Sequence, residues 1–275
     1  TQEGLERFVV FFQPKVDMRS GKTVGAEALV RGVDRRGLIV PPSHFMEHME
    51  NSGAIRNLDL FVLDSTLAAM ERWRRKGLQL LPISVNFSRF TLFSPSSPGA
   101  VLAILSRYPY ISSTLLELEI SESALDVETG SLIRAMDFFR PFGLSFSLDD
   151  FGCRYSNLSL FTSVAFDTIK LDRSLVKDII TNAMSLELVE DIIGLCSTRK
   201  MSCIAEGVEN QAQVDALLNV GGMYAQGFYY ARPIPMMEFE QNHLIRSITG
   251  KPEMRPADQK AVHAGSRCPC LLSWV

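Results

Sequence analysis

Short apolar segments alternate with longer segments of helical periodicity along most of this chain, and this alternation constrains the fold more than any other feature. Strand-like segments cover residues 80–87, 115–120, 144–148, 168–171, 201–205 and 224–228. Helical segments cover residues 55–76, 100–107, 130–140, 185–199, 211–220 and 236–248. The first helix is expected to end at Gly77, because glycine readily adopts the left-handed backbone that closes many helices. Such alternation predicts parallel strands packed against helices.

Two further strands precede this region and are joined too tightly to be parallel. Residues 8–14 and 23–30 are strand-like, and Ser20-Gly21-Lys22 between them has the composition of a turn. A parallel pair needs a crossover of about a dozen residues or more, so these two strands are expected to be antiparallel. Together with the later strands they make about eight. The sequence therefore favours an α/β fold, a TIM-like (β/α)8 barrel whose initial hairpin departs from the regular pattern.

Composition excludes several functional classes. The chain has 275 residues, of which 46% are hydrophobic and 21% charged, and its net charge is −3 with both signs interspersed. It lacks the basic face expected of a protein that binds long nucleic acid. The sequence has no apolar run of about 18 residues, so no contact with a membrane is expected. The five cysteines, including Cys268 and Cys270 near the C-terminus, fit no zinc or disulfide spacing and are expected to be reduced cytoplasmic thiols.

Polar side chains recur where successive strands end. These residues are Glu27, Asn86, Glu119, Asp149, Asp150, Lys170, Glu206 and Gln226. In a barrel the carboxyl ends of parallel strands meet on one face, where several acids would repel one another unless divalent cations bound between them. Hard oxygen ligands suit Mg²⁺ or Mn²⁺, and two such ions can support phosphodiester hydrolysis. Helix capping or solvent exposure would explain any one of these residues alone, but not the whole series.

Ordered motifs surround these strand-end residues. They include Gln13-Pro14-Lys15-Val16-Asp17, Glu27-Ala28-Leu29-Val30-Arg31, Val85-Asn86-Phe87-Ser88, Leu118-Glu119-Ile120-Ser121-Glu122-Ser123, Asp149-Asp150-Phe151-Gly152, Lys170-Leu171-Asp172, Ala205-Glu206-Gly207-Val208-Glu209 and Gln226-Gly227-Phe228. They resemble, in order, the Q-P-I-V-D, E-A-L-x-R, V-N-x-S, L-E-I-T-E-S, D-D-F-G, K-I-D, A-E-G-V-E and Q-G-Y motifs of the EAL family of cyclic di-GMP phosphodiesterases. The resemblance extends from about residue 8 to residue 248.

The resemblance implies a barrel with its first strand antiparallel to the rest, and hydrolysis of cyclic di-GMP to linear pGpG by two Mg²⁺ or Mn²⁺ ions. One ion would be bound by Glu27, Asn86, Glu119 and Asp149, and the other by Asp149, Asp150 and Glu206. Lys170 would orient the attacking water and Glu206 would accept its proton, so the expected catalytic residues are Lys170, Glu206 and Glu27. The substrate would contact Gln13, Arg31, Asp172 and Gln226, and the ligands would be supported by Glu122 and Glu209.

The resemblance also sets expected domain boundaries. Residues 1–7 would be a linker from an upstream region, residues 8–248 the barrel, and residues 249–275 a loosely structured tail, since they show little periodicity. Because the chain starts with Thr1, it is expected to be a module of a longer protein, with a sensor or GGDEF domain upstream. The resemblance further implies a homodimer. The reduced thiols predict a cytoplasmic location, either for the whole protein or for the cytoplasmic part of a protein attached to a membrane.

One loop departs from the family pattern. The family reads D-D-F-G-T-G-Y-S-S, whereas Cys153 and Arg154 replace the Thr and the second Gly here. Arginine does not adopt positive φ as cheaply as glycine, and cysteine lacks the hydrogen-bonding strength of a hydroxyl. Since this loop joins the metal site to the dimerisation region in the family, a second interpretation stays open. The chain would then be a weak or inactive EAL domain that acts as a cyclic di-GMP receptor or a protein-interaction module.

A zinc motif is a weaker candidate. His44-Phe45-Met46-Glu47-His48 fits the H-x-x-E-H pattern of inverted zinc peptidases, and one helix would place both histidines on the same face. Short motifs of this kind match by chance often, and this segment also resembles a scaffold helix of the EAL family. The scaffold interpretation is therefore preferred.

Overall fold

The structure, a computed structural model, describes residues 5–121, 129–152 and 163–245. Eight strands close into a barrel: β1 (Leu5–Asp17), β2 (Thr23–Asp34), β4 (Ile83–Asn86), β5 (Leu116–Ser121), β6 (Ser145–Phe151), β7 (Thr168–Leu171), β8 (Ser202–Glu206) and β9 (Tyr224–Gln226). β1 lies between β2 and β9 and is antiparallel to both, whereas the other neighbours in the barrel are parallel. The predicted barrel with an antiparallel first strand is confirmed.

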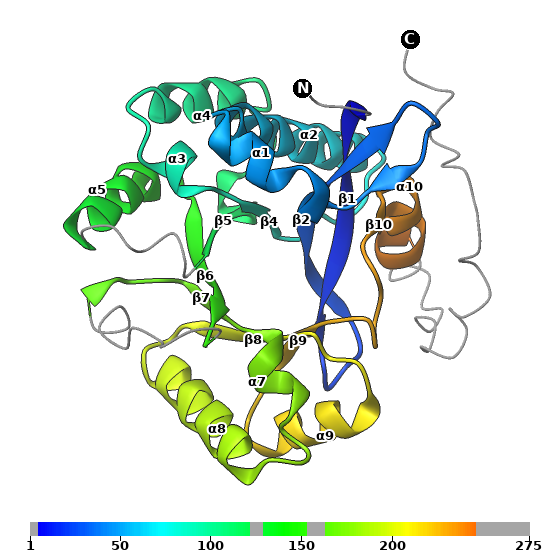
Figure 1. Cartoon of the computed structure of the whole chain (residues 1–275), viewed down its shortest axis with the longest axis vertical. Coiled ribbons are helices and arrows are strands. Elements are labelled where there is room, and N and C mark those ends of the chain that lie inside the picture. The colour runs from blue at the N-terminus through cyan, green and yellow to red at the C-terminus, as the bar shows by residue number, and fades with distance from the viewer. Residues whose placement is uncertain (1–4, 122–128, 153–162, 246–275) are drawn as a thin grey trace.

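Helices cover the outside of the barrel (Figure 1). They are α1 (Met46–Asn51), α2 (Ile55–Arg75), α3 (Arg89–Leu92), α4 (Ser97–Ser106), α5 (Thr129–Phe139), α7 (Arg173–Lys177), α8 (Ala183–Thr198), α9 (Gln211–Asn219) and α10 (Met236–Phe239). Strand residues that face these helices are apolar and fully buried, as Leu118, Phe146 and Ile169 show. Residues that face inward are largely polar, because side chains alternate along a strand. The apolar core therefore surrounds the barrel, and its interior is left for charged groups.

The β1–β2 hairpin is long, and its turn is built by side-chain hydrogen bonds. The carboxylate of Asp17 accepts bonds from the backbone amides of Arg19 and Ser20 at 2.8 and 3.0 Å, and Gly21 has a φ of 69°. The turn thus uses an Asp and a Gly at the positions where their conformational preferences help most. Register pairs run from Leu5–Asp34 to Val16–Thr23, so the hairpin spans the full height of the barrel.

The barrel closes unevenly at the seam between β1 and β9. β9 pairs with β1 at Val16 and Asp17, and the short β10 (Ile234–Pro235) pairs with β1 at Phe11 and Phe12. Between these two ladders, residues 13–15 of β1 have no strand partner on this side within the described part of the chain. The side chains of Gln13 and Gln226, which form a hydrogen bond, close this stretch instead. Next to the β10 ladder, the rings of Phe12, Trp73 and Phe239 pack with centroids 5.2–5.6 Å apart and join β1, α2 and α10.

The predicted boundaries are close for the long elements and fail for the short ones. The helix predicted over 55–76 is α2, and Gly77 has the expected positive φ. The strand predicted over 80–87 is shorter (β4, Ile83–Asn86). The helix predicted over 236–248 divides into α10 and a π-helical turn (Glu240–Ile245), where buried Glu240 forms ion pairs with Arg72 and Lys76. α1 covers part of the segment expected to be a scaffold helix, whereas α3, α7, β10 and β3 (Ile39–Val40) were not predicted, because segments this short show no periodicity.

A buried carboxylate on α2 fixes the segment that follows β4. Asp59 is 6% exposed, and its Oδ2 accepts hydrogen bonds from the Ser88 amide at 2.9 Å and the Thr91 hydroxyl at 2.6 Å. Burial raises the pKa of Asp59 to about 6, although both hydrogen bonds oppose the shift. The folded state therefore holds this proton more tightly than the unfolded chain, whose aspartates titrate near about 3.9.

We expect Asp59→Asn to remove part of the pH dependence of folding. The raised pKa stabilises the wild type below about pH 4, and this contribution is lost as the pH rises through about 6, a change on the order of 3 kcal/mol. Asparagine retains an acceptor oxygen but does not titrate. Urea unfolding between pH 4 and 7 should show the variant gaining stability relative to wild type as pH rises. A variant that loses relative stability over this range would show that the ionised carboxylate is the favoured form.

Candidate functional site: an acid cluster around a buried lysine

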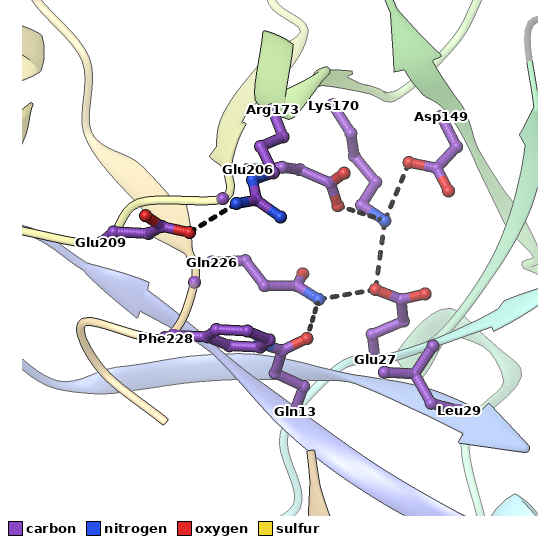
Figure 2. A pocket seen from close by; sticks show the side chains of 12 residues that line it. Gln13, Glu27, Leu29, Asp149, Lys170, Arg173, Glu206, Glu209, Gln226 and Phe228 are labelled. Carbon is purple, nitrogen blue, oxygen red and sulfur yellow. Dashed lines mark hydrogen bonds and ion pairs between the residues drawn. The ribbon is translucent and has the colours of Figure 1, made fainter. Parts of the chain in front are cut away.

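The ammonium group of Lys170 lies among four carboxylates inside the barrel. Its Nζ is 2.7 Å from Glu206, 2.8 Å from Glu119, 3.0 Å from Asp149 and 3.2 Å from Glu27. These acids come from β8, β5, β6 and β2, so four strands converge on one lysine of β7. Figure 2 shows Lys170 between Glu206, Asp149 and Glu27. Lys170 is 1% exposed, so a single buried ammonium meets all four carboxylates.

The pKa shifts reveal an excess of negative charge. Burial alone would lower the pKa of Lys170, but the surrounding carboxylates raise it well above its ordinary value. Burial raises the pKa values of Glu27, Asp149 and Glu206, and partial burial raises that of Asp150. Nearby acids raise all four further against the opposing charge of Lys170. The carboxylates thus favour the ammonium form of Lys170, and the cluster holds more acids than its lysines can balance.

A bulge in β6 directs two consecutive aspartates to the same site. In a regular strand Asp149 and Asp150 would face opposite sides of the sheet. The pairing of β6 with β7 shifts register between Leu148 and Phe151, and Asp150 has a φ of 57°. Aspartate adopts this left-handed conformation more readily than most residues, and bulges often redirect side chains beside active sites. The Asp150 amide also donates to the Asp149 carboxylate at 3.0 Å.

Two groups of three acids result, and they share Asp149. One comprises Glu27, Glu119 and Asp149, and the other Asp149, Asp150 and Glu206. Within each group, one carboxylate oxygen from every residue lies within 4.8 Å of the others. The donor atoms are hard oxygens and the charge is in excess, so the residues fit small divalent cations in both groups.

Two glutamines extend the site to the barrel seam. The Gln226 amide nitrogen donates to Glu27 at 2.6 Å and to the Gln13 oxygen at 3.0 Å, and Gln13 donates to the Ala231 carbonyl at 3.0 Å. On the other side of Glu27, Asn86 donates to it at 2.7 Å. The Gln226 oxygen is buried and has no hydrogen-bond partner within the described residues. This acceptor therefore has capacity for a donor from a bound molecule.

A cleft of about 240 Å³ opens above the acids. Its wall includes Arg173, Glu209 and Phe228, whose ring is 45% exposed and lies 4.0 Å below the guanidinium of Arg232. Gly227 lets the loop after β9 approach the segment that follows β8, since a Cβ there would lie 2.2 Å from the carbonyl oxygen of Val208. The cleft thus combines an acidic floor with aromatic and cationic groups at its rim.

The other predicted site residues lie outside the acid cluster or outside the described residues. Arg31 donates to the Val30 carbonyl at 2.7 Å and lies over the Phe11 ring. Asp172 caps α7 by accepting from the Ser174 amide, and it raises the pKa of Asp150 in addition to burial. Glu209 pairs with Arg173 at 2.8 Å. The described residues do not include Glu122, the substituted positions Cys153 and Arg154, or the tail with Cys268 and Cys270.

A second charged layer lies beneath the cluster, toward the amino-terminal end of the barrel, and was not predicted from the sequence. Lys15 contacts Glu117 at 3.0 Å and Glu119 at 2.9 Å, and the Thr168 hydroxyl donates to Glu117 at 2.6 Å. Strand alternation is the signal that could have found it, because Glu117 precedes Glu119 by two residues and Thr168 precedes Lys170 by two.

The structure also bears on the zinc motif, the cysteines and the expected absence of membrane contact. His44 ends a 3-10 turn (Pro42–His44) and His48 lies in α1, so one helix does not carry both histidines, and both are exposed. Neither histidine belongs to a metal-compatible group among the described residues. Cys196 and Cys203 are free thiols. No helix within the described ranges is long and apolar enough to cross a membrane.

Comparisons with known proteins agree with this architecture. The EAL domain family model matches residues 2–233. The cyclic di-GMP phosphodiesterase PdeR of Escherichia coli (strain K12) is 32% identical over 237 residues, and the cyclic di-GMP phosphodiesterase RocR of Pseudomonas aeruginosa is 30% identical over 232 residues. These alignments cover 86% and 84% of this chain but 35% and 59% of the two relatives. The chain therefore spans about a third of PdeR and less than two thirds of RocR.

Solved structures show the same fold. The structure titled "PaMucR Phosphodiesterase, c-di-GMP complex" superposes with a TM-score of 0.79 at 28% identity, over 84% of this chain and 94% of that one. The EAL domain of DcpA from Mycobacterium smegmatis gives a TM-score of 0.72 at 30% identity, over 86% of this chain and 97% of that one. With the family model matching nearly the whole described region, these findings show that the chain belongs to the EAL domain family.

Proposed function

We propose that this EAL domain is a metal-dependent phosphodiesterase that hydrolyses cyclic di-GMP to linear pGpG. The observation that carries the proposal is the pair of three-acid groups sharing Asp149, placed at the carboxyl ends of the barrel strands below a cleft. Relatives named as cyclic di-GMP phosphodiesterases at 30–32% identity support the choice of substrate.

The two groups define which residues would hold two Mg²⁺ or Mn²⁺ ions. Glu27, Glu119 and Asp149, with the oxygen of Asn86, would hold one ion, and Asp149, Asp150 and Glu206 the other. Asn86 directs its amide nitrogen toward Glu27 in this structure, so its side chain would rotate to present oxygen. When bound, such ions would lower the pKa of water and stabilise the charge that develops on the phosphate and the leaving oxygen.

Lys170 and Glu206 would divide the proton chemistry between them. Lys170 remains protonated, so it would serve as a hydrogen-bond donor that orients the attacking water and would not act as a base. Glu206 lies 2.7 Å from this ammonium, and burial raises its pKa well above the ordinary range. This distance would place Glu206 beside the water that Lys170 would orient, so Glu206 is the proposed proton acceptor. Glu27 would be a ligand that also fixes Lys170.

Substrate contacts are proposed for residues around the cleft. Gln226 has a free buried acceptor, and Gln13 positions its amide. Arg31 follows Glu27 and Leu29 on the inward face of β2, where its guanidinium would meet a phosphate. Asp172 caps α7 next to the second acid group and would contact the substrate from there.

The domain division, oligomeric state and cellular location are also proposed. A barrel over residues 8–248, a linker before it and a tail after it remain the proposed division, as do a homodimer, a cytoplasmic location and an upstream sensor or GGDEF domain. Glu122 and Glu209 would support the ligands.

Turnover with different metals tests the proposed function. Cyclic di-GMP incubated with the protein should give pGpG in Mg²⁺ or Mn²⁺, but not after chelation or in Ca²⁺, which is larger and does not activate water as the smaller ions do. Glu27→Gln should lower the rate about 100-fold or more, because it removes one ligand charge. Chromatographic separation of the products measures this. Tight binding of cyclic di-GMP without product in any metal would instead support the receptor function suggested by Cys153 and Arg154.

Asp150→Asn tests whether the second acid group, Asp149, Asp150 and Glu206, binds its own ion. Asparagine tolerates the positive φ at this position, so the bulge should persist while the second group loses one charge. Titration of metal-free protein with Mn²⁺ should give two ions per wild-type chain and one per variant chain. Glu187→Gln is the matched control, because it removes an exposed carboxylate of α8 that belongs to neither group. Two tightly bound ions in Asp150→Asn would contradict the assignment.

A further inference from the structure

Lys15 reaches the acid cluster from the opposite end of the barrel. It lies on β1, is 6% exposed, and places Nζ 2.9 Å from Oε1 of Glu119. The other oxygen of Glu119, Oε2, lies 2.8 Å from Nζ of Lys170. Each oxygen of this carboxylate therefore has its own lysine, one from each end of the barrel. Lys15 also contacts Glu117 at 3.0 Å, away from the cluster.

This double contact fixes the orientation of Glu119. The side chain is fully buried, so in the intact protein the two lysines satisfy its oxygens in place of water. Rotation of the carboxylate would break one of two charge-assisted hydrogen bonds, which are about twice as strong as neutral ones. Burial alone would raise the pKa of Glu119, but Lys15 and Lys170 together hold it below its ordinary value. Glu119 differs in this from Glu27, Asp149, Asp150 and Glu206, whose pKa values are all raised.

We propose that Lys15 is a positioning residue for the acid cluster, holding Oε1 of Glu119 so that the carboxylate presents its Oε2 side to Glu27 and Asp149. The inference rests on the proposed function, because it assigns Lys15 a role in arranging a metal ligand. Without Lys15, Glu119 would keep one cationic partner and would turn both oxygens toward Lys170. That rotation would remove a ligand atom from the first acid group and draw the ammonium away from Asp149.

A cavity at the amino-terminal end of the barrel makes this role accessible to experiment. Its volume is about 330 Å³, and its lining includes Lys15, Glu117, Ser145, Thr168, Ser202 and Tyr224. This cavity is separate from the cleft above the acids, because no residue lines both spaces. A shortened side chain at position 15 would open space from this cavity toward Glu119. A small alkylammonium ion can therefore enter from the end remote from the proposed active site.

Lys15→Met and Glu117→Gln form a matched pair of variants. Both variants break the ion pair between Lys15 and Glu117, but Glu117→Gln leaves the contact between Lys15 and Glu119 in place. Metal-free proteins would be titrated with Mn²⁺ by calorimetry, and turnover of cyclic di-GMP would be normalised to the folded fraction. Lys15→Met should weaken Mn²⁺ binding about tenfold or more and lower the rate, as loss of residues that orient metal ligands commonly does. Glu117→Gln should stay within about threefold of wild type.

Chemical rescue supplies a second variant should Lys15→Met fail to fold. Lys15→Ala refolded with ethylammonium should recover Mn²⁺ affinity at least about tenfold, whereas tetramethylammonium, which has no N–H donor, should not. The positioning role would be overturned if Lys15→Met and Glu117→Gln bound Mn²⁺ equally well. It would also be overturned if both ammonium ions restored the Mn²⁺ affinity of Lys15→Ala equally. Wild-type protein that neither binds Mn²⁺ nor turns over substrate would instead refute the proposed function, so the two failures are distinguishable.

Discussion

The arrangement of charge around Lys170 is the constraint on which the site depends. Four buried or half-buried carboxylates from four strands approach one ammonium within 2.7–3.2 Å. Burying an ion pair costs several kcal/mol per ion and is repaid by good geometry and further hydrogen bonds. Asn86 and Gln226 supply such bonds to Glu27. The barrel must therefore hold its strands in one register, because a shift of one residue would turn these groups outward.

The antiparallel first strand gives this barrel an interior that parallel strands alone would not provide. β1 enters from the carboxyl face and carries Gln13 near the cluster and Lys15 two residues deeper. Lys15 can thus contact Glu119 from below while Lys170 contacts it from the side of the cleft. Most TIM-type barrels fill this space with branched apolar side chains. Here a column of alternating acids and lysines fills it, and the apolar residues lie between the strands and the helices.

Much of the architecture was predictable, because long elements and strand ends leave clear patterns. The antiparallel hairpin, the helix over 55–76 and the convergence of Glu27, Glu119, Asp149, Lys170 and Glu206 were all expected from sequence and are present. The bulge at Asp150 was not, because its φ of 57° depends on how β6 pairs with β7. The contact between Lys15 and Glu119 was missed for a related reason, since it joins residues 104 positions apart on different strands. Patterns along the chain report which face a side chain occupies, not which partner it meets.

The seam between β1 and β9 carries a consequence for sequence divergence within this fold. Strand ladders close this wall above and below, but Gln13 and Gln226 join it in between through their side chains. The same two residues face the acid cluster and hold Glu27. A lineage that abandoned the chemistry would remain free to replace Asp150, which is exposed, while replacement of either glutamine would also weaken barrel closure. Retention of this glutamine pair is therefore a record of the fold, and retention of Asp150 is the better record of catalysis.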